Sequence, residues 1–172
     1  MNVTQVRFLT VVLIVGILLP YVDLMPRPVA AQPTSLTIEQ AIQIATDYLG
    51  GGVAYEAEIE DEYGVLEYEV GFTNGYKVYV DAYSGAVVWA RQKRPKRYAT
   101  EMEQLPIRLI PAIQIAQNAY NVGFVYEAEL DDDARRWEYK VRFSDGTRVY
   151  VDATTGDVLE IRGRNRGDGR RR

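Results

Sequence analysis

The sequence predicts an α+β protein of two tandem modules, each a helix packed on a four-stranded antiparallel meander sheet. Three observations lead to this fold class. Residues 38–91 and 109–162 match in one ungapped register, which indicates an internal duplication. Each copy opens with apolar residues at helical spacing. Each copy then alternates apolar and polar residues between short turn signals, a pattern typical of antiparallel strands that pair in sequence order.

The duplication is carried by three short segments at the same spacing. The segment AIQIA occurs at 41–45 and 112–116, YEAE at 55–58 and 126–129, and VYVDA at 78–82 and 149–153. We therefore divide the chain into a first repeat at 32–91 and a second at 107–162, separated by a basic linker at 92–106. A module of about 55 residues is small for a core of its own, so we expect the copies to pack together or to share a continuous sheet surface.

Each repeat begins with a predicted amphipathic helix. In the first repeat the apolar residues from Ile38 to Leu49 fall on one face. Thr37 and Gln40 form a capping box before this helix, and the glycines at 50–52 end it. In the second repeat Pro111 suits the first helical turn.

Four strands are expected after each helix. In the first repeat the alternation runs through 55–60 and 66–72, and the turn dipeptide Asn74-Gly75 leads into a third strand. Ser84-Gly85 then turns the chain into a last strand at 86–91. The second repeat follows the same plan, with turns at 145–146 and 155–156 and a last strand at 157–162.

The N-terminal segment 1–31 has the features of a secretory signal peptide. Arg7 precedes the apolar run at 8–19, and Ala31 offers a cleavage site. As a helix, this run rises only about 18 Å, short of the roughly 30 Å core of a bilayer, so a retained anchor is the weaker interpretation. We expect an exported protein, periplasmic or secreted, with no stable membrane span after cleavage.

The composition removes several classes of function. The chain of 172 residues contains neither cysteine nor histidine. A thiol nucleophile, a disulfide, a thiolate or imidazole zinc site and an imidazole base are therefore excluded. An enzyme would have to work with carboxylates, Lys, Tyr or a hard metal. We expect no enzyme, no catalytic residue and no cofactor.

Acidic residues dominate both repeats, whereas the linker and the tail at 163–172 are basic. The acidic hairpins at 60–62 and 131–133 lack EF-hand spacing, so solvated turns are favoured over Ca²⁺ sites and no metal site is predicted. The carboxylates of the expected first and second strands project from the solvent face instead of lining a glycosidase cleft. We expect the tail to be a disordered, solubilising segment, and the acidic repeats argue against nucleic-acid binding.

The aromatic residues suggest a binding surface. Tyr79 and Tyr150 lie in the opposite register from the apolar residues of their strands, so we expect both on the exposed face of the sheet. Tyr among alternating charges suits protein recognition, although lateral packing between the copies would explain the same pattern. The candidate partner-binding residues are Tyr79, Tyr150, Lys77, Arg148, Glu67, Glu69 and Glu138.

Two sequence runs resemble the PepSY domain. Residues 137–141 (WEYKV) with 149–159 (VYVDATTGDVL) are similar to its strand and turn pattern, as are residues 66–70 (LEYEV) with 79–85 (YVDAYSG). The helix at 41–45 also fits, whereas Ile110-Pro111 departs from the usual polar helix start. The resemblance covers both repeats. It implies a module of helix and antiparallel sheet, found in propeptides of secreted metallopeptidases and in extracytoplasmic proteins, with an inhibitory or regulatory role and no catalytic residues.

Two functions from different classes follow as hypotheses. The first is an exported, non-catalytic module that docks on a protein partner, such as a secreted or envelope peptidase, through the exposed sheet face. The alternative is an extracytoplasmic sensor or carrier of a cation or an anionic envelope polymer, which would use the acidic hairpins or the basic tail. An enzyme would require a deep, carboxylate-lined cleft between the copies.

Overall fold

The computed structural model describes residues 35–62, 64–133 and 136–163, without the side chain of Asp133. The chain divides into two units, residues 1–31 and 32–172, and all described residues belong to the second. The predicted signal peptide and almost all of the predicted tail therefore lie outside the described residues. The elements run in the order α1 (Ile38–Leu49), β1 (Ala54–Glu62), β2 (Val65–Phe72), β3 (Tyr76–Asp81), β4 (Val87–Gln92), α2 (Ala99–Gln104), α3 (Leu109–Ala119), β5 (Val125–Asp133), β6 (Arg136–Phe143), β7 (Arg148–Asp152) and β8 (Val158–Arg162).

The strands form a single antiparallel sheet with the order β4-β3-β2-β1-β5-β6-β7-β8. The α+β class is thus confirmed, and each repeat supplies four neighbouring strands in meander order. Two separate four-stranded sheets are not what the structure shows, because β1 and β5 pair with each other through Glu56–Glu129, Ala57–Ala128 and Glu58–Glu127. Pairing of these two edges satisfies backbone groups that separate sheets would leave exposed.

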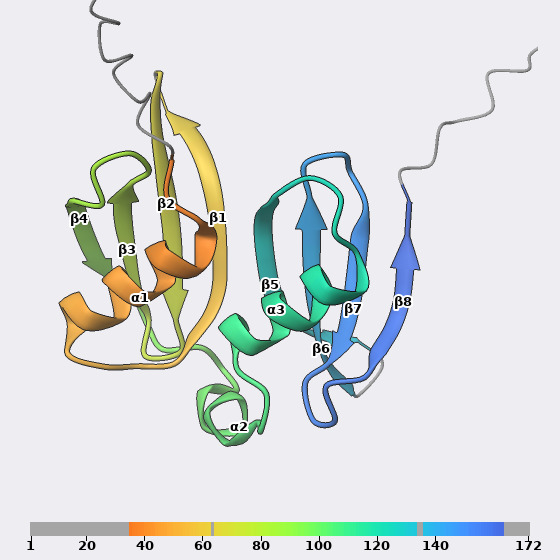
Figure 1. Ribbon diagram of the computed structural model, residues 1–172. Coiled ribbons are helices and arrows are strands. Elements are labelled where there is room, and N and C mark those ends of the chain that lie inside the picture. Colours follow the sequence, from red (N-terminus) through yellow and green to blue (C-terminus); the bar gives the residue numbers. More distant parts are fainter. Residues whose placement is uncertain (1–34, 63, 134–135, 164–172) are drawn as a thin grey trace, which may run out of the picture. The chain divides into compact units, whose positions relative to one another are not determined.

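Helices α1 and α3 lie on the same face of the sheet (Figure 1). Helix α1 contacts strands of the first repeat and α3 contacts strands of the second, and the two helices also contact each other. Ile38 and Ile42 of α1 and Leu109 and Ile113 of α3 belong to the same buried cluster as the valines of β2, β3, β6 and β7. One continuous core therefore forms under both helices, and of the residues that the structure describes, neither α1 nor α3 lies on the opposite face of the sheet.

The predicted helix signals are present. The amide of Gln40 donates to Thr37 Oγ1 at 3.4 Å, and the amide of Thr37 donates to Gln40 Oε1 at 2.8 Å, which is the expected capping box. Gly50 ends α1 with a positive φ of 69°. Pro111 lies in the first turn of α3, whose N-cap Arg108 makes no side-chain capping bond.

The basic linker is fixed to the first repeat, although its composition favours a flexible connection. Its backbone donates from Lys93 to the Gly75 carbonyl at 2.8 Å and from Lys96 to the Thr73 carbonyl at 2.9 Å. Helix α2 follows, and Glu103 at its end accepts a hydrogen bond from the Thr73 hydroxyl at 2.7 Å. None of the helices in the described ranges combines the length and the apolar character needed to cross a bilayer.

Asp81 and Asp152 shape the turns that lead into the last strand of each repeat. Asp81 Oδ1 accepts from the amides of Tyr83 and Ser84 at 3.1 and 2.7 Å, and Asp152 Oδ1 accepts from two amides in the equivalent turn. The Ser84 amide is the main cause of the lowered pKa of Asp81. These carboxylates are structural, as expected for acids placed before Ser-Gly and Thr-Gly turns.

Candidate functional site

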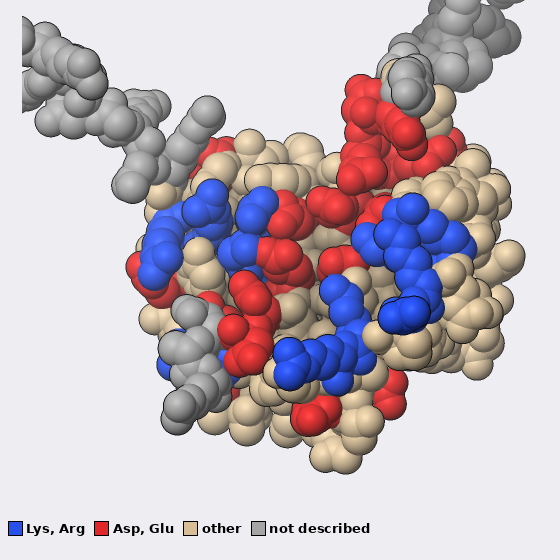
Figure 2. All heavy atoms as spheres, turned by 180° about the vertical axis from the view of Figure 1, so that it is seen from behind, with Lys and Arg blue, Asp and Glu red and all other residues tan. Residues whose placement is uncertain are grey.

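The candidate site is the sheet face opposite α1 and α3, which we call the open face. Cross-strand pairing places on it, strand by strand, Trp89 and Arg91 of β4, Lys77 and Tyr79 of β3, Glu67 and Glu69 of β2, Glu56 and Glu58 of β1, Glu127 and Glu129 of β5, Glu138, Lys140 and Arg142 of β6, Arg148 and Tyr150 of β7, and Glu160 and Arg162 of β8. Figure 2 shows this face: acidic side chains gather along its middle and basic side chains flank them. The structure therefore brings all seven sequence-predicted candidates to one surface.

The centre of the open face has local twofold symmetry. Ala57 and Ala128 are equivalent positions in the two repeats, and they pair with each other across β1 and β5. Glutamates flank this pair on both strands, so Glu56 faces Glu129 and Glu58 faces Glu127. Four carboxylates thus meet where the repeats join, and like charges directly opposite each other are unfavourable unless cations compensate them.

Cations compensate three of the four carboxylates. Lys77 Nζ lies 3.0 Å from Glu56 Oε1. In the second repeat Arg142 Nη1 lies 2.6 Å from Glu127 Oε2, and Lys140 forms an ion pair with Glu129. Among the described residues no cation lies within ion-pair distance of Glu58.

Glu58 is consequently the most perturbed carboxyl of the centre. Burial, followed by the charges of Glu60 and Glu127, raises its pKa from 4.5 to about 7. Burial also raises the pKa of Glu127, although Arg142 opposes the shift. The symmetric backbone therefore carries an asymmetric distribution of charge.

The strand next to the junction carries a glycine in the first repeat where the second repeat has an arginine. Gly71 is the residue of β2 that pairs with Glu56, and a Cβ there would lie 2.5 Å from Glu56 Oε1. The glycine leaves room for the Glu56 side chain to lie across β2. The equivalent residue in the second repeat is Arg142, which binds Glu127 directly. The first repeat thus accommodates its junction glutamate beside a residue without a side chain, and the second repeat does so by an ion pair.

Glu69 is the hub of a polar network in the first repeat. It is only 6% exposed and forms ion pairs with Lys77 and Arg91 and a hydrogen bond with the hydroxyl of Tyr79. Burial alone would raise the pKa of Glu69, but the hydrogen bonds from Lys77 and Tyr79 outweigh it and lower the pKa. The network fixes long side chains in place on the open face.

The expectation that Tyr79 is exposed is wrong. Its side chain is 5% exposed, although it lies on the predicted face. The ring stacks on Trp89 with 4.0 Å between centroids and 5° between planes, and its hydroxyl accepts from Arg91 Nη2 at 2.6 Å. Side chains of the neighbouring strands, and not the second repeat, therefore cover Tyr79.

The remaining candidates differ in accessibility. Arg148 is exposed and Tyr150 is half-buried, with the guanidinium of Arg162 4.9 Å from the Tyr150 ring centre. Glu138 is 6% exposed and accepts from Arg136 Nη2 at 3.3 Å, so it is shielded like Glu69. Of these residues, Arg148 and Tyr150 thus remain accessible to a partner.

Glu67 also lies on the open face. Burial, followed by the charge of Glu62, raises the pKa of Glu67.

Trp89 and Arg91 belong to this site although sequence reasoning did not select them. Trp89 is 42% exposed and pairs with Tyr79, and Arg91 pairs with Lys77. The turn at 84–85 alone does not reveal this, because a register shift follows the Val80–Val87 pair and brings Trp89, in place of Val88, opposite Tyr79.

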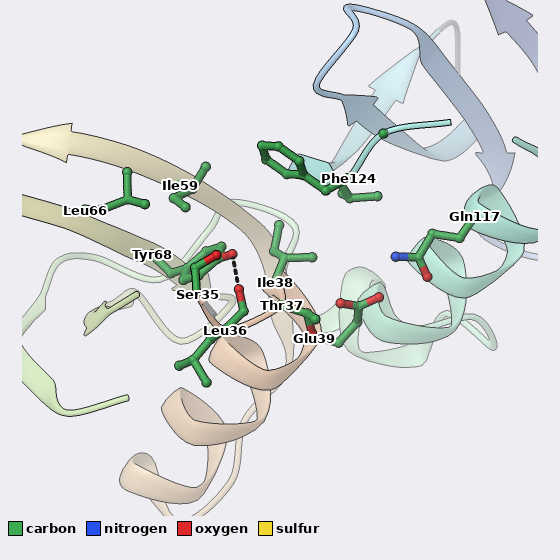
Figure 3. Close-up of a pocket in the computed structure, with 12 residues that line it drawn as sticks. Ser35, Leu36, Thr37, Ile38, Glu39, Ile59, Leu66, Tyr68, Gln117 and Phe124 are labelled. Atoms are coloured by element: carbon green, nitrogen blue, oxygen red, sulfur yellow. Dashed lines mark hydrogen bonds between the residues drawn. The ribbon is translucent and has the colours of Figure 1, made fainter. Parts of the chain in front are cut away.

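A separate cavity of about 360 Å³ lies on the helix side, next to the start of α1. Figure 3 shows Ile38, Ile59 and Phe124 around it, with Glu39 and Gln117 at the side of the helices, and the Tyr68 hydroxyl donating to the Leu36 carbonyl at 2.6 Å. Phe124 is 61% exposed. The cavity adjoins the first described residue of the chain. Within residues 35–62, 64–133 and 136–163, no three acids converge in a way that could hold a metal ion.

Comparison with protein families gives one match. The model of the PepSY family, described as the peptidase propeptide and YPEB domain, matches residues 35–88 and 112–162. These segments coincide with the two repeats. No curated protein compared with the chain is significantly similar to it.

Three solved structures are similar at low identity. A provisionally named lipoprotein from Clostridium difficile 630 is 23% identical, with 77% of this chain and 95% of that chain covered and a TM-score of 0.47. A provisionally named periplasmic protein from Bacteroides vulgatus ATCC 8482 is 19% identical, with 78% and 99% covered and a TM-score of 0.27. A provisionally named calcium-regulated periplasmic protein from Bacteroides thetaiotaomicron is 20% identical, with 76% and 96% covered and a TM-score of 0.27. At these scores the names of the three proteins carry no argument about this chain.

Proposed function

Because the chain belongs to the PepSY family, we propose that it is an exported, non-catalytic module that binds a protein partner through the open face of its sheet. The observation that carries the proposal is the one-sided placement of the helices. Both α1 and α3 cover the same face, so in the described part of the chain these helices leave the opposite face of the eight strands, with its charged and aromatic rows, uncovered (Figures 1 and 2).

The open face has the properties of a preorganised binding surface. Its side chains are held by the ion pairs around Glu69, by the Tyr79–Trp89 stack and by the contact of Arg142 with Glu127. Side chains fixed in this way lose little conformational entropy when a partner docks. Exposed Trp and Arg are also the residue types that most often dominate binding energy at protein interfaces.

The partner we propose is a peptidase exported to the same compartment. The family is named after peptidase propeptides, and the N-terminal segment of this chain reads as a secretory signal. The acidic middle of the open face would complement a basic surface on the peptidase, with the basic flanks restricting its orientation. Binding through a sheet face presents no extended loop for cleavage, which suits an inhibitor or a regulator.

The test compares variants of the two faces. Trp89 and Arg148 are exposed on the open face, whereas Tyr48 is exposed at the end of α1. We expect Trp89→Ala with Arg148→Ala to weaken retention of the partner from the native envelope or secreted fraction by about ten-fold or more, and Tyr48→Ala to leave it unchanged. Equal retention of the partner by the wild type, the double variant and Tyr48→Ala would contradict docking on the open face.

The regulatory part of the proposal has its own readout. The retained partner is identified by mass spectrometry, and its peptide-bond hydrolysis is measured with increasing amounts of this protein. We expect activity to change in a saturable way that the open-face variant loses. A partner without peptidase activity would refute the peptidase proposal while leaving the docking surface intact.

A further inference from the structure

We propose a second binding site, for phosphate-bearing ligands, in the pocket between the basic linker and the turn that joins β2 to β3. The pocket has a volume of about 360 Å³, at the small end of the range for small-molecule sites. Its walls include Lys93, Arg94 and Lys96 of the linker and Lys77 of β3. The pocket shares Lys77 and Glu56 with the open face, whereas Lys93, Arg94 and Lys96 of the linker lie outside that face, and the proposal depends on these three.

The charge of the pocket is not neutralised from within. Glu56 is the acid in its wall, and its carboxylate is already compensated by Lys77 at 3.0 Å and by the Tyr55 hydroxyl at 2.5 Å. No acid among the described residues lies within ion-pair distance of Lys93, Arg94 or Lys96. Three uncompensated cations therefore line one small hollow.

These cations are positioned by the backbone. Lys93 and Lys96 are anchored by the hydrogen bonds of their amides to the carbonyls of Gly75 and Thr73. The linker packs so closely on Gly75 that a Cβ there would lie 2.3 Å from the Lys93 carbonyl oxygen. The ammonium group of Lys96 lies 4.2 Å from the ring centre of Tyr55. The linker is thus held against the sheet, with three cationic residues along one pocket.

Phosphate fits this arrangement better than a single carboxylate does. A phosphate monoester carries close to two negative charges at neutral pH and offers three acceptor oxygens in different directions. The arginine and lysine donors of the linker match such a group, and the guanidinium of Arg94 is a planar fork that can pair with two of its oxygens. Tyr76, which is half-buried, is the aromatic residue of the lining against which the organic part of an ester would pack, whereas Tyr55 and Phe72 are buried.

The experiment follows backbone amide signals by NMR while inorganic phosphate, pyrophosphate, glycerol 3-phosphate or acetate is added to the purified protein at constant ionic strength. We expect saturable shifts at Gly75 and at the linker with the phosphate compounds and much weaker ones with acetate. Tighter binding of glycerol 3-phosphate than of inorganic phosphate would assign the pocket to phosphate esters, and tighter binding of pyrophosphate would assign it to inorganic polyphosphates.

Two variants that each remove one positive charge distinguish a specific site from nonspecific electrostatic attraction. Arg94→Gln removes a pocket cation, and Arg148→Gln removes an exposed cation on β7, in the other half of the sheet. We expect Arg94→Gln to weaken binding about ten-fold and Arg148→Gln to weaken it less than about two-fold. Lys96→Gln, a second change at an exposed pocket residue, is expected to act like Arg94→Gln. Equal effects of Arg94→Gln and Arg148→Gln, or shifts that never saturate, would overturn the proposal.

Discussion

Replacing Glu58 by Gln is expected to stabilise the protein above neutral pH, which is unusual for a residue of a charged surface. Glu58 faces Glu127 across the β1–β5 junction and lacks a cation partner among the described residues. Ionising its carboxyl therefore costs free energy in the folded state. The cost is absent from the unfolded chain, where the pKa returns to its ordinary value.

The magnitude follows from the raised pKa. The gap between 4.5 and about 7 corresponds to at most about 3.5 kcal/mol, at roughly 1.4 kcal/mol per pKa unit. Because Glu58 is only half-buried, solvent screening reduces this to about 1–2 kcal/mol. The folded state binds the extra proton between these two pKa values, so the penalty is fully present above pH 7 and disappears as the pH falls toward 4.5.

The assay is urea unfolding of the wild type and of Glu58→Gln at pH 5 and pH 8. We expect the variant to be about 1–2 kcal/mol more stable at pH 8 and about equal at pH 5. Glu129→Gln is the matched control, because Glu129 is the equivalent residue of the second repeat and is paired with Lys140. Removing that partner should cost about 0.5–1 kcal/mol. Loss of stability in both variants at pH 8 would refute the reasoning.

Three further predictions concern local structure, each measured as a change in the free energy of unfolding. Glu69→Ala removes the shared partner of Lys77 and Arg91 and should cost about 2 kcal/mol. Because the pKa of Glu69 is lowered in the folded state, this cost is fully present above pH 4.5 and is lost as the pH falls below that value. An unchanged stability would contradict its role as hub. Gly75→Ala combines a φ of 89° with a clash against the linker backbone and should cost more than about 2 kcal/mol, whereas Gly64→Ala, with a φ of 84° and open space around it, should cost about 1 kcal/mol; equal costs would argue against the close approach of the linker. Thr37→Ala removes the N-cap acceptor of α1 and should cost about 1 kcal/mol, and no loss would show that the cap is dispensable.

Much of the fold could be read from the sequence because its signals are local. The helix start at Thr37 and the turns at Asn74-Gly75 and Ser84-Gly85 each depend on residues a few positions apart. The duplication repeats the turn signals in the second half of the chain, although α3 lacks a side-chain cap. The helix start and the first turn are confirmed by the capping box and by the positive φ of Gly75.

The junction of the repeats could not be derived in the same way. The alternation of apolar and polar residues in β1 does not predict which strand pairs with its second edge. The pairing of Glu56 with Glu129 also brings like charges together, whereas cross-strand pairs prefer opposite charges. The pairing becomes favourable only with Lys77, Lys140 and their neighbours in place. Those contacts join residues far apart in the chain, which a local pattern does not reveal.

The site was predicted at the level of the face but not of the single residue. The period of two placed Tyr79 and Glu69 correctly on the open face. Their burial depends on the reach of Trp89 and Arg91 from the adjacent strand, which is a property of long side chains and not of register. The fixed linker was missed for a related reason, because its anchors are backbone groups that carry no compositional signal.

The most direct test of the docking proposal uses the absence of cysteine from the chain. A single cysteine is introduced at Glu160 on the open face or at Gln114 on α3, and its rate of maleimide labelling is measured with and without the isolated partner. We predict that the partner slows labelling at position 160 at least ten-fold and leaves position 114 unchanged. Protection at position 114 with free labelling at position 160 would contradict the proposal.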